Sequence, residues 1–234
     1  MSDSNYLELL ADRYPNIRAA TAEYINLKAI LALPKGTEYF LSDLHGEHEA
    51  FIHMLRSASG TIKTKIDEHY AGILSEDDRE DLAALIYNPQ AEIERRKKTE
   101  IDFSQWCVTV IYRLVTICKS VSTKYTRSRV RNRLPKYLDY AMDELLHADD
   151  EENRVHYYSE IINTVVNFGF GEIFITEMAD AISRLAVDKL HIIGDVYDRG
   201  AHPDTIMDYL MFKFPGCAIM TKRIHTFDYY TYAI

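Results

Sequence analysis

The sequence YFLSDLHGE at residues 39–47 places a short apolar run directly before two groups that can bind a metal ion, Asp43 and His45. A second stretch, LHIIGDVYDRG at residues 190–200, repeats this order, because its apolar run leads into Gly-Asp with the carboxylate at Asp195. Both apolar runs are typical of short buried strands. Open α/β sheets build their sites at the carboxyl ends of their strands. We therefore expect the two stretches to meet at one end of one sheet.

Most of the remaining chain has the periodicity of helices. Apolar residues recur at helical spacing before Pro34, and residues 48–56 repeat the pattern after the first strand. Across residues 61–187 the helical pattern is almost continuous, and it is clearest at residues 103–121. A further helix is expected at residues 134–146. The sequence therefore predicts an α/β layer with a long, mostly helical insertion between two of its strands.

This pattern divides the chain into three parts. Residues 1–60 and 188–216 form a partial α/β core, and residues 61–187 form the helical insertion. Residues 217–234 form an atypical tail that is rich in tyrosine and fits no obvious pattern, apart from a third strand that can start at residues 217–220.

The composition excludes several classes of protein. The 234 residues include 27 Lys and Arg against 36 Asp and Glu, a formal net charge of −9, so nucleic acid is not an expected partner. No apolar stretch approaches the ~20 residues needed to cross a bilayer, and the N-terminus does not have the pattern of a signal peptide. The three cysteines have no metal-binding spacing, and Cys107 and Cys118 are expected to be small buried hydrophobic residues. We expect a cytoplasmic protein with reduced thiols and no membrane partner.

The two acidic stretches contain the residue types of a two-metal phosphatase centre. Two divalent ions ~3.5–4 Å apart promote hydrolysis of a phosphate ester by activating the nucleophile and neutralising the phosphoryl oxygens. Carboxylate and imidazole are suitable ligands for such ions. Asp43 and His45 are two positions apart and can reach one ion, whereas Asp195 follows the neighbouring strand and can bridge both. These three residues are the predicted metal ligands.

The residues around these ligands have supporting roles in this prediction. Gly46 and Gly194 allow the backbone to approach the ions closely. Arg199 offers a planar guanidinium group to a substrate phosphate, and Asp198 is expected to orient an imidazole through a hydrogen bond. Either stretch alone is weak evidence, because an aspartate after a strand often only caps backbone amides. The combination of the two is far more specific.

The motif Asp-x-His-Gly, followed later by Gly-Asp-x-x-Asp-Arg-Gly, resembles the calcineurin-like metallophosphoesterase family. Within that family, residues 39–47 and 190–200 and the long helix-rich stretch between them resemble class 3 fructose-1,6-bisphosphatase. The Ser/Thr protein phosphatases share the motifs but separate them by a much shorter stretch, which disfavours that group. The resemblance extends over residues 1 to roughly 215.

This resemblance implies the N-terminal part of a calcineurin-like metallophosphoesterase sheet. It also implies a bacterial cytoplasmic enzyme of gluconeogenesis that uses manganese to remove the 1-phosphate of the sugar bisphosphate fructose 1,6-bisphosphate. By the same resemblance, Asp43 and His45 would ligate one ion and Asp195 would bridge the two. Arg199 would hold the phosphate.

The chain departs from the family pattern after Gly216. Family members continue with Gly-Asn-His and two later histidines, whereas this sequence contains no Gly-Asn-His and is far shorter than those proteins. The asparagine would ligate the second ion and its neighbouring histidine would be the general acid, so no complete catalytic set is expected. His225 is not expected to replace that histidine, because its flanking residues have the wrong turn chemistry. We expect a truncated or frame-shifted product with an altered sequence from about residue 217, and with little or no phosphatase activity.

Two other functions stay open at this point. A phosphoesterase acting on dinucleotides or phosphoproteins would share the metal motifs but would not explain the helical insertion. An inactive fragment or interaction module would explain the incomplete set of ligands. Without the further strands that the longer family members would contribute, the sheet would have an exposed edge. We therefore expect self-association. The basic segment at residues 124–136 either binds an anionic partner or forms a solvated face.

Overall fold

Three short parallel strands form the sheet that brings the two acidic stretches together. The computed structural model describes residues 3–147, 154–213 and 218–220. The strands are β1 (Glu38–Leu41), β2 (Lys189–Ile192) and β3 (Ala218–Met220), and they pair in the order β1-β2-β3. The register of the first pair is set by Glu38 opposite Lys189 and Leu41 opposite Ile192. The sheet confirms an α/β protein in which the helices greatly outnumber the strands.

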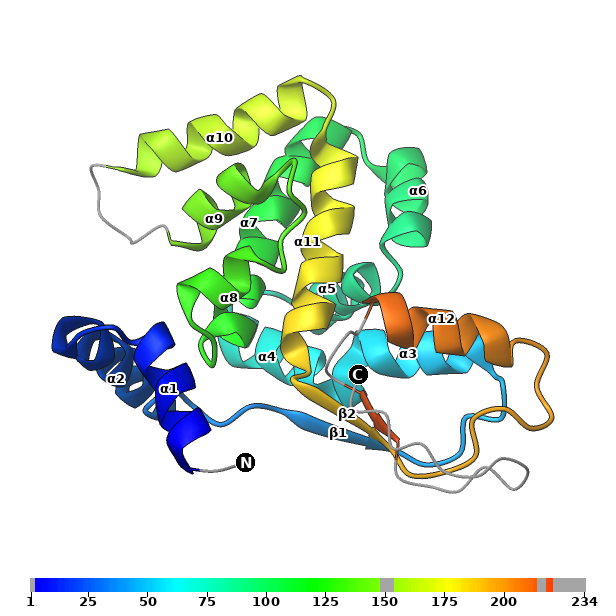
Figure 1. Cartoon of the computed structure of the whole chain (residues 1–234). Helices are drawn as coiled ribbons and strands as arrows, with labels where there is room; N and C mark the ends of the chain where they lie inside the picture. The colour runs from blue at the N-terminus through cyan, green and yellow to red at the C-terminus, as the bar shows by residue number, and fades with distance from the viewer. Residues whose placement is uncertain (1–2, 148–153, 214–217, 221–234) are drawn as a thin grey trace.

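Helices make up most of the described chain (Figure 1). They are α1 (Asp3–Arg13), α2 (Ile17–Leu31), α3 (His48–Ser57), α4 (Thr61–Tyr70), α5 (Glu76–Tyr87), α6 (Pro89–Thr99), α7 (Phe103–Ser122), α8 (Arg127–Arg131), α9 (Asp139–Leu146), α10 (Val155–Asn167), α11 (Gly171–Ala186) and α12 (Pro203–Lys213), with a 3₁₀ turn, η1 (Ala58–Gly60).

The larger hydrophobic cluster lies among the helices between β1 and β2. Its centre is the packing of α7 along α11, and Figure 1 shows α11 running directly into β2. The buried face of α7 follows a spacing of three or four residues, as an amphipathic helix requires. The residues on that face include Val110, Leu114, Ile117 and Val121. Cys107 and Cys118 are buried free thiols, as expected, and burial raises their pKa values to about 11 and about 12.

A smaller hydrophobic cluster supports the two acidic stretches. It combines residues of β1 and β2 with residues of α3 and α12, which lie next to each other on the sheet in Figure 1. The fully or nearly fully buried members are Leu41, Leu44, Phe51, Leu55, Leu190, Ile192, Val196, Ile206 and Leu210. The strand ends are therefore supported by a core of their own. The division of the chain into domains stays a prediction.

Two parts of the chain differ from the sequence-based expectations. The helix expected at residues 134–146 begins only at Asp139, because the chain around Pro135 forms a turn closed by the N–H of Leu138 on the carbonyl of Pro135 (2.9 Å). Proline disfavours helical geometry in the residue before it, which separates this turn from α8. The helices expected before Pro34 do form, but α2 contains no buried residue.

The basic segment at residues 124–136 is partly solvated and partly engaged with the rest of the chain. The side chain of Lys124 is only 9% exposed and pairs with Asp188 (2.8 Å). Arg127 donates to the buried carboxylate of Asp143 (2.9 Å), and Arg133 donates to the carbonyl of Arg184 (2.7 Å). Several of these cations therefore connect the α7–α8 region to other parts of the same chain.

No helix among the described residues is long and apolar enough to cross a membrane. The tail at residues 217–234 lies outside the described residues, except for the three residues of β3. His225 and Cys217 also lie outside the described residues.

Candidate metal centre at the strand ends

The loops that follow β1 and β2 are held together by backbone hydrogen bonds. The carbonyl of Asp195 accepts from the N–H groups of Leu44 (2.7 Å) and His45 (3.0 Å). The N–H of Gly46 donates to the carbonyl of Val196 (2.8 Å). Each loop thus supplies backbone partners for the other, and the two acidic stretches form one structural unit, as the sequence predicted.

A side chain adds to this connection. Oδ1 of Asp43 accepts from the N–H of Asp195 (2.8 Å). The first predicted ligand therefore holds the backbone of the second, across a separation of about 150 positions in the sequence. The Asp43 side chain therefore accepts from a backbone amide. This is the structural role that an aspartate after a strand often has.

Two glycines permit the close approach of the loops. A Cβ atom at Gly194 would lie 2.1 Å from Oδ1 of Asp43, and a Cβ atom at Gly200 would lie 2.0 Å from the carbonyl oxygen of His45. No side chain fits at either position without moving the opposite loop. Gly194 and Gly200 are therefore required by the packing of the loops, whatever the metal chemistry.

His45 and Asp198 form a direct polar pair. Nδ1 of His45 lies 2.6 Å from Oδ1 of Asp198. An ionised carboxylate can only accept, so Nδ1 carries the proton and donates. The hydrogen bond from His45 lowers the pKa of Asp198 below its ordinary value. This arrangement fixes the ring orientation and leaves Nε2 as the nitrogen suited to a metal ion.

Two residues of the motifs have backbone dihedrals that non-glycine residues rarely adopt. His45 has φ = 48° and Arg199 has φ = 76°. Residues in this left-handed region cost free energy and cluster at functional sites. The strain occurs at a predicted ligand and at the predicted phosphate-binding residue.

The predicted site residues gather at one end of the sheet, but they do not close around a common point. Within residues 3–147, 154–213 and 218–220, no group of three or more His, Cys, Asp or Glu side chains has the spacing to hold a metal ion. Nε of Arg199 lies 3.4 Å from Oδ2 of Asp198, and the Arg199 side chain is otherwise directed to solvent. The assignment of Asp43, His45 and Asp195 as metal ligands stays a prediction.

The donor set nevertheless suits a divalent ion such as manganese. It combines the carboxylates of Asp43 and Asp195 with the imidazole of His45, whose tautomer is fixed by a third carboxylate, Asp198. Histidine ligands in metal sites commonly donate their other N–H to a carboxylate in this way. Carboxylate and imidazole ligands are compatible with manganese, iron and zinc.

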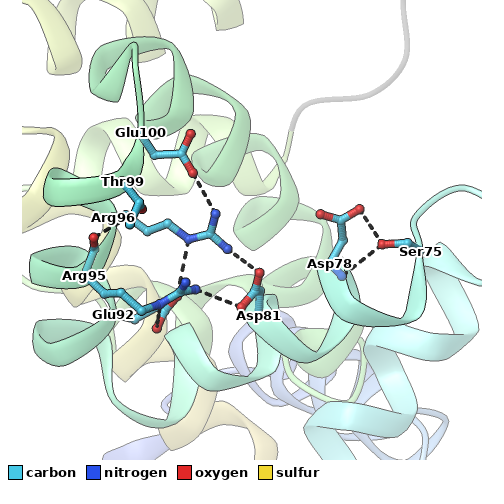
Figure 2. Close-up of polar contacts among 8 residues, drawn as sticks. All are labelled: Ser75, Asp78, Asp81, Glu92, Arg95, Arg96, Thr99 and Glu100. Atoms are coloured by element: carbon cyan, nitrogen blue, oxygen red, sulfur yellow. Dashed lines mark hydrogen bonds and ion pairs between the residues drawn. The ribbon is translucent and has the colours of Figure 1, made fainter.

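A cavity of about 510 Å³ lies elsewhere, between α5, α6 and α7. Its carboxylates are already engaged: Figure 2 shows the guanidinium of Arg96 among Asp81, Glu92 and Glu100, with Arg95 beside it. Ser75 caps the start of α5 in the same view. This network joins α5 to α6 and leaves the strand ends as the candidate site.

Sequence reasoning missed the residues at the opposite end of the strands. Lys124, Thr37 and Asp188 form a partly buried polar cluster where β1 and β2 begin. A signal was present, because Lys124 opens the basic segment and Asp188 directly precedes the second predicted strand. Periodicity cannot show that these two residues meet, since they are far apart in the sequence.

The fold and the site together define an α/β protein with acidic and imidazole groups at the carboxyl ends of parallel strands. Residues 5–216 match the sequence model of a family described as Firmicute fructose-1,6-bisphosphatase. This match extends over most of the 234 residues, and the chain belongs to that family.

Three similar proteins carry the name fructose-1,6-bisphosphatase class 3. The protein of Clostridium tetani is 50% identical over 210 residues, which are 89% of this chain and 32% of that protein. The proteins of Clostridium novyi and Parabacteroides distasonis are each 48% identical over 210 residues, with the same shares. The chain thus spans about a third of the length of these relatives. No solved structure matches the chain.

Proposed function

We propose that this chain provides the first metal-binding segments of a class 3 fructose-1,6-bisphosphatase. The reaction is hydrolysis of fructose 1,6-bisphosphate to fructose 6-phosphate and phosphate, a step of gluconeogenesis in the cytoplasm. The names of the relatives support this substrate, and the family match extends over both acidic stretches. In this proposal the strands belong to a calcineurin-like metallophosphoesterase sheet.

The observation that carries the proposal is the interlock of the two stretches. Asp43 bonds the N–H of Asp195, and His45 bonds Asp198, so each stretch orients a residue of the other. A simple pair of turns would not need two glycines whose Cβ atoms have no room. The interlock gathers ligand-type residues of both stretches at one end of the sheet, which supports a metal-dependent phosphatase.

The roles proposed for the individual residues come from the resemblance of the two motifs to the metallophosphoesterase family. Asp43 and His45 would ligate one manganese ion and Asp195 would bridge to the second. Asp198 holds the imidazole of His45 in place through the 2.6 Å hydrogen bond. The exposed guanidinium of Arg199 would bind a phosphate oxygen. When bound, the manganese ions supply Lewis-acid polarisation of the phosphoryl group.

These residues are too few for a complete dinuclear centre. The sequence lacks the Gly-Asn-His motif that would supply a ligand of the second ion and a general acid. We therefore propose that this chain binds one manganese ion weakly and turns over fructose 1,6-bisphosphate slowly or not at all.

Manganese titration of the purified full chain tests the metal centre. Calorimetry on the wild type should show one weak site, and His45→Ala should abolish it. Asp198→Asn should raise the Kd for manganese by about 10- to 100-fold, because partners of metal-binding histidines have effects of that size. His69→Ala is the matched control, since His69 is an exposed histidine of α4.

Equal binding by the wild type and His45→Ala, or no binding by the wild type, would contradict the proposed metal site. Phosphate release from fructose 1,6-bisphosphate should stay near background with manganese present. Turnover at the rate of a relative with the full set of ligands would contradict the proposal that this ligand set is incomplete.

We also propose weak self-association through the edge of the sheet. Among the described strands, β1 pairs on one side only, and its Phe40 side chain is 58% exposed. An unpaired strand edge offers backbone donors and acceptors to a second copy. Sedimentation velocity should show a concentration-dependent shift toward dimer, and a single monomeric species at all concentrations would refute this.

A further inference from the structure

A partly buried polar cluster joins the starts of β1 and β2. We call it the amino-end clamp, and it consists of Thr37, Lys124 and Asp188. Thr37 precedes β1, Asp188 precedes β2, and Lys124 comes from the end of the α7 region. The clamp therefore connects both strands that carry the predicted ligands to the helical part of the chain.

The three residues of the clamp are each bonded to the other two. Nζ of Lys124 lies 2.8 Å from Oδ2 of Asp188 and donates to Oγ1 of Thr37 (2.9 Å) and to the carbonyl of Ala186 (2.9 Å). The same Oδ2 accepts from the N–H of Thr37 (2.7 Å). The carbonyl of Thr37 in turn accepts from the N–H of Asp188 (2.9 Å). One ammonium group thus has partners on both strand entries at once.

The clamp is shielded from water. The side chains of Lys124 and Asp188 are 9% and 12% exposed. The ring of Tyr125 packs beside the clamp, with the cations of Lys124, Arg129 and Arg133 within 5.3 Å of its centre. Charge pairs with so little exposure have demanding geometry, because each unmet donor or acceptor is costly.

The clamp acts on a very short strand pair. β1 and β2 pair over only four residues each, and a slip by one residue would turn every side chain to the opposite face. Beyond the carboxyl ends, the loops meet through Leu44, His45 and Gly46, whose amides bond the second stretch. Both ends of this pair must therefore be in register for the predicted ligands to meet.

We propose that Lys124 is a positioning residue for the metal centre: by holding Thr37 and Asp188 at the strand starts, it sets the register that brings Asp43 and His45 to Asp195. This inference rests on the proposed function for its metal-binding consequence. It concerns a residue of the helical region that is at the opposite end of the strands from the ligands.

The test compares positioning with stability in the full chain. Lys124→Met removes the ammonium group and keeps an unbranched side chain. Amide hydrogen exchange should become about tenfold faster at Leu44, His45 and Gly46, because their bonds to the second stretch open more often. The Kd for manganese should rise by about tenfold or more.

Two further variants separate the clamp from general destabilisation. Leu114→Ala removes a fully buried side chain of α7 in the helical cluster, and Ile117→Val is a milder replacement for the same purpose if Leu114→Ala fails to fold. Either should lower the Tm without changing the exchange of the loop amides or the affinity for manganese. In Lys124→Met/Asp188→Leu the charge pair is removed as a whole, although the N–H of Thr37 loses its acceptor, so the Tm should recover in part while the loop amides stay fast.

The outcomes are distinct. Loop exchange that is unchanged in Lys124→Met, or equally fast in the Leu114 or Ile117 control at matched stability, overturns the positioning role. Recovery of slow loop exchange in the double variant also overturns it. If the wild type binds no manganese, the proposed function fails, and the exchange measurements still decide the role of Lys124.

Discussion

Asp188 and Asp198 are carboxylates on either side of the same strand, β2, and their surroundings differ sharply. Asp188 is 12% exposed and accepts from an ammonium group and a backbone N–H. Asp198 is 46% exposed and accepts from the imidazole of His45. Burial acts to raise the pKa of Asp188, but its donors outweigh burial and lower the pKa, whereas the pKa of Asp198 is lowered mainly by one hydrogen bond.

The difference separates structural from chemical roles along one strand. A buried carboxylate with several donors has a fixed charge and a fixed position, and it makes a rigid anchor. An exposed carboxylate whose partners are an imidazole and an exposed guanidinium can respond to a ligand or a proton. The amino end of the strand pair therefore fixes the positions of the two strands. The carboxyl end carries the predicted site residues, several of which are exposed to solvent.

The largest expected effect is at the buried end. Asp188→Ala removes the counter-charge of the Lys124 ammonium group and the acceptor of the Thr37 N–H, so the free energy of unfolding should fall by about 3–5 kcal/mol. Urea unfolding followed by circular dichroism measures this. Glu38→Ala is the control, because Glu38 is an exposed carboxylate at the start of β1, and its loss should change stability by less than about 0.5 kcal/mol. Equal losses of unfolding free energy in the two variants would show that the clamp carboxylate contributes no more than an exposed one.

An intermediate effect is expected where the loops meet. Gly194→Ala would place a Cβ atom 2.1 Å from Oδ1 of Asp43, so the loops must separate, at a cost of about 1–3 kcal/mol. Gly171→Ala, at the first turn of α11, is the matched control. Its new Cβ atom would lie 3.3 Å from the nearest atom, Sγ of Cys107. Thermal unfolding of both variants makes the comparison. A smaller loss for Gly194→Ala than for Gly171→Ala would show that the loops can adjust.

The smallest effect is expected at the exposed end. Because the folded-state pKa of Asp198 is lowered, its bond to His45 contributes at pH values above the ordinary aspartate pKa of ~3.9 and is lost as the pH falls through the lowered value. NMR titration of the carboxyl carbon should show this pKa rising toward the ordinary value in His45→Ala. An unchanged titration would mean that the pair does not persist in solution.

The sequence predicted the strands and the principal helices well, because their periods are local. The residues of β1 and β2, and of α3 and α7, stand within about two positions of their expected bounds. The helix start expected at residue 134 was wrong, because the chain around Pro135 forms a turn that periodicity does not encode.

The sequence predicted which residues belong to the candidate site, but it did not predict the contacts between them. The residue types and the strand-end location followed from the two motifs. The bond from Asp43 to the N–H of Asp195, and the steric need for Gly194, became clear only with the loops in place. The amino-end clamp had no motif at all, because a single lysine that pairs with a single distant aspartate has no repeating pattern to detect.

Helix α2 has a thermodynamic consequence of a different kind. None of its residues is buried, so its helical state depends on local terms: the cap from Asn16 to the N–H of Ala19 (3.0 Å) and the hydrogen bonds between its own backbone groups. A helix of 15 residues with only such support is marginally stable in water. The helicity of α2 is therefore expected to fall gradually on warming. The packed helices α7 and α11 are expected to unfold together in one cooperative step.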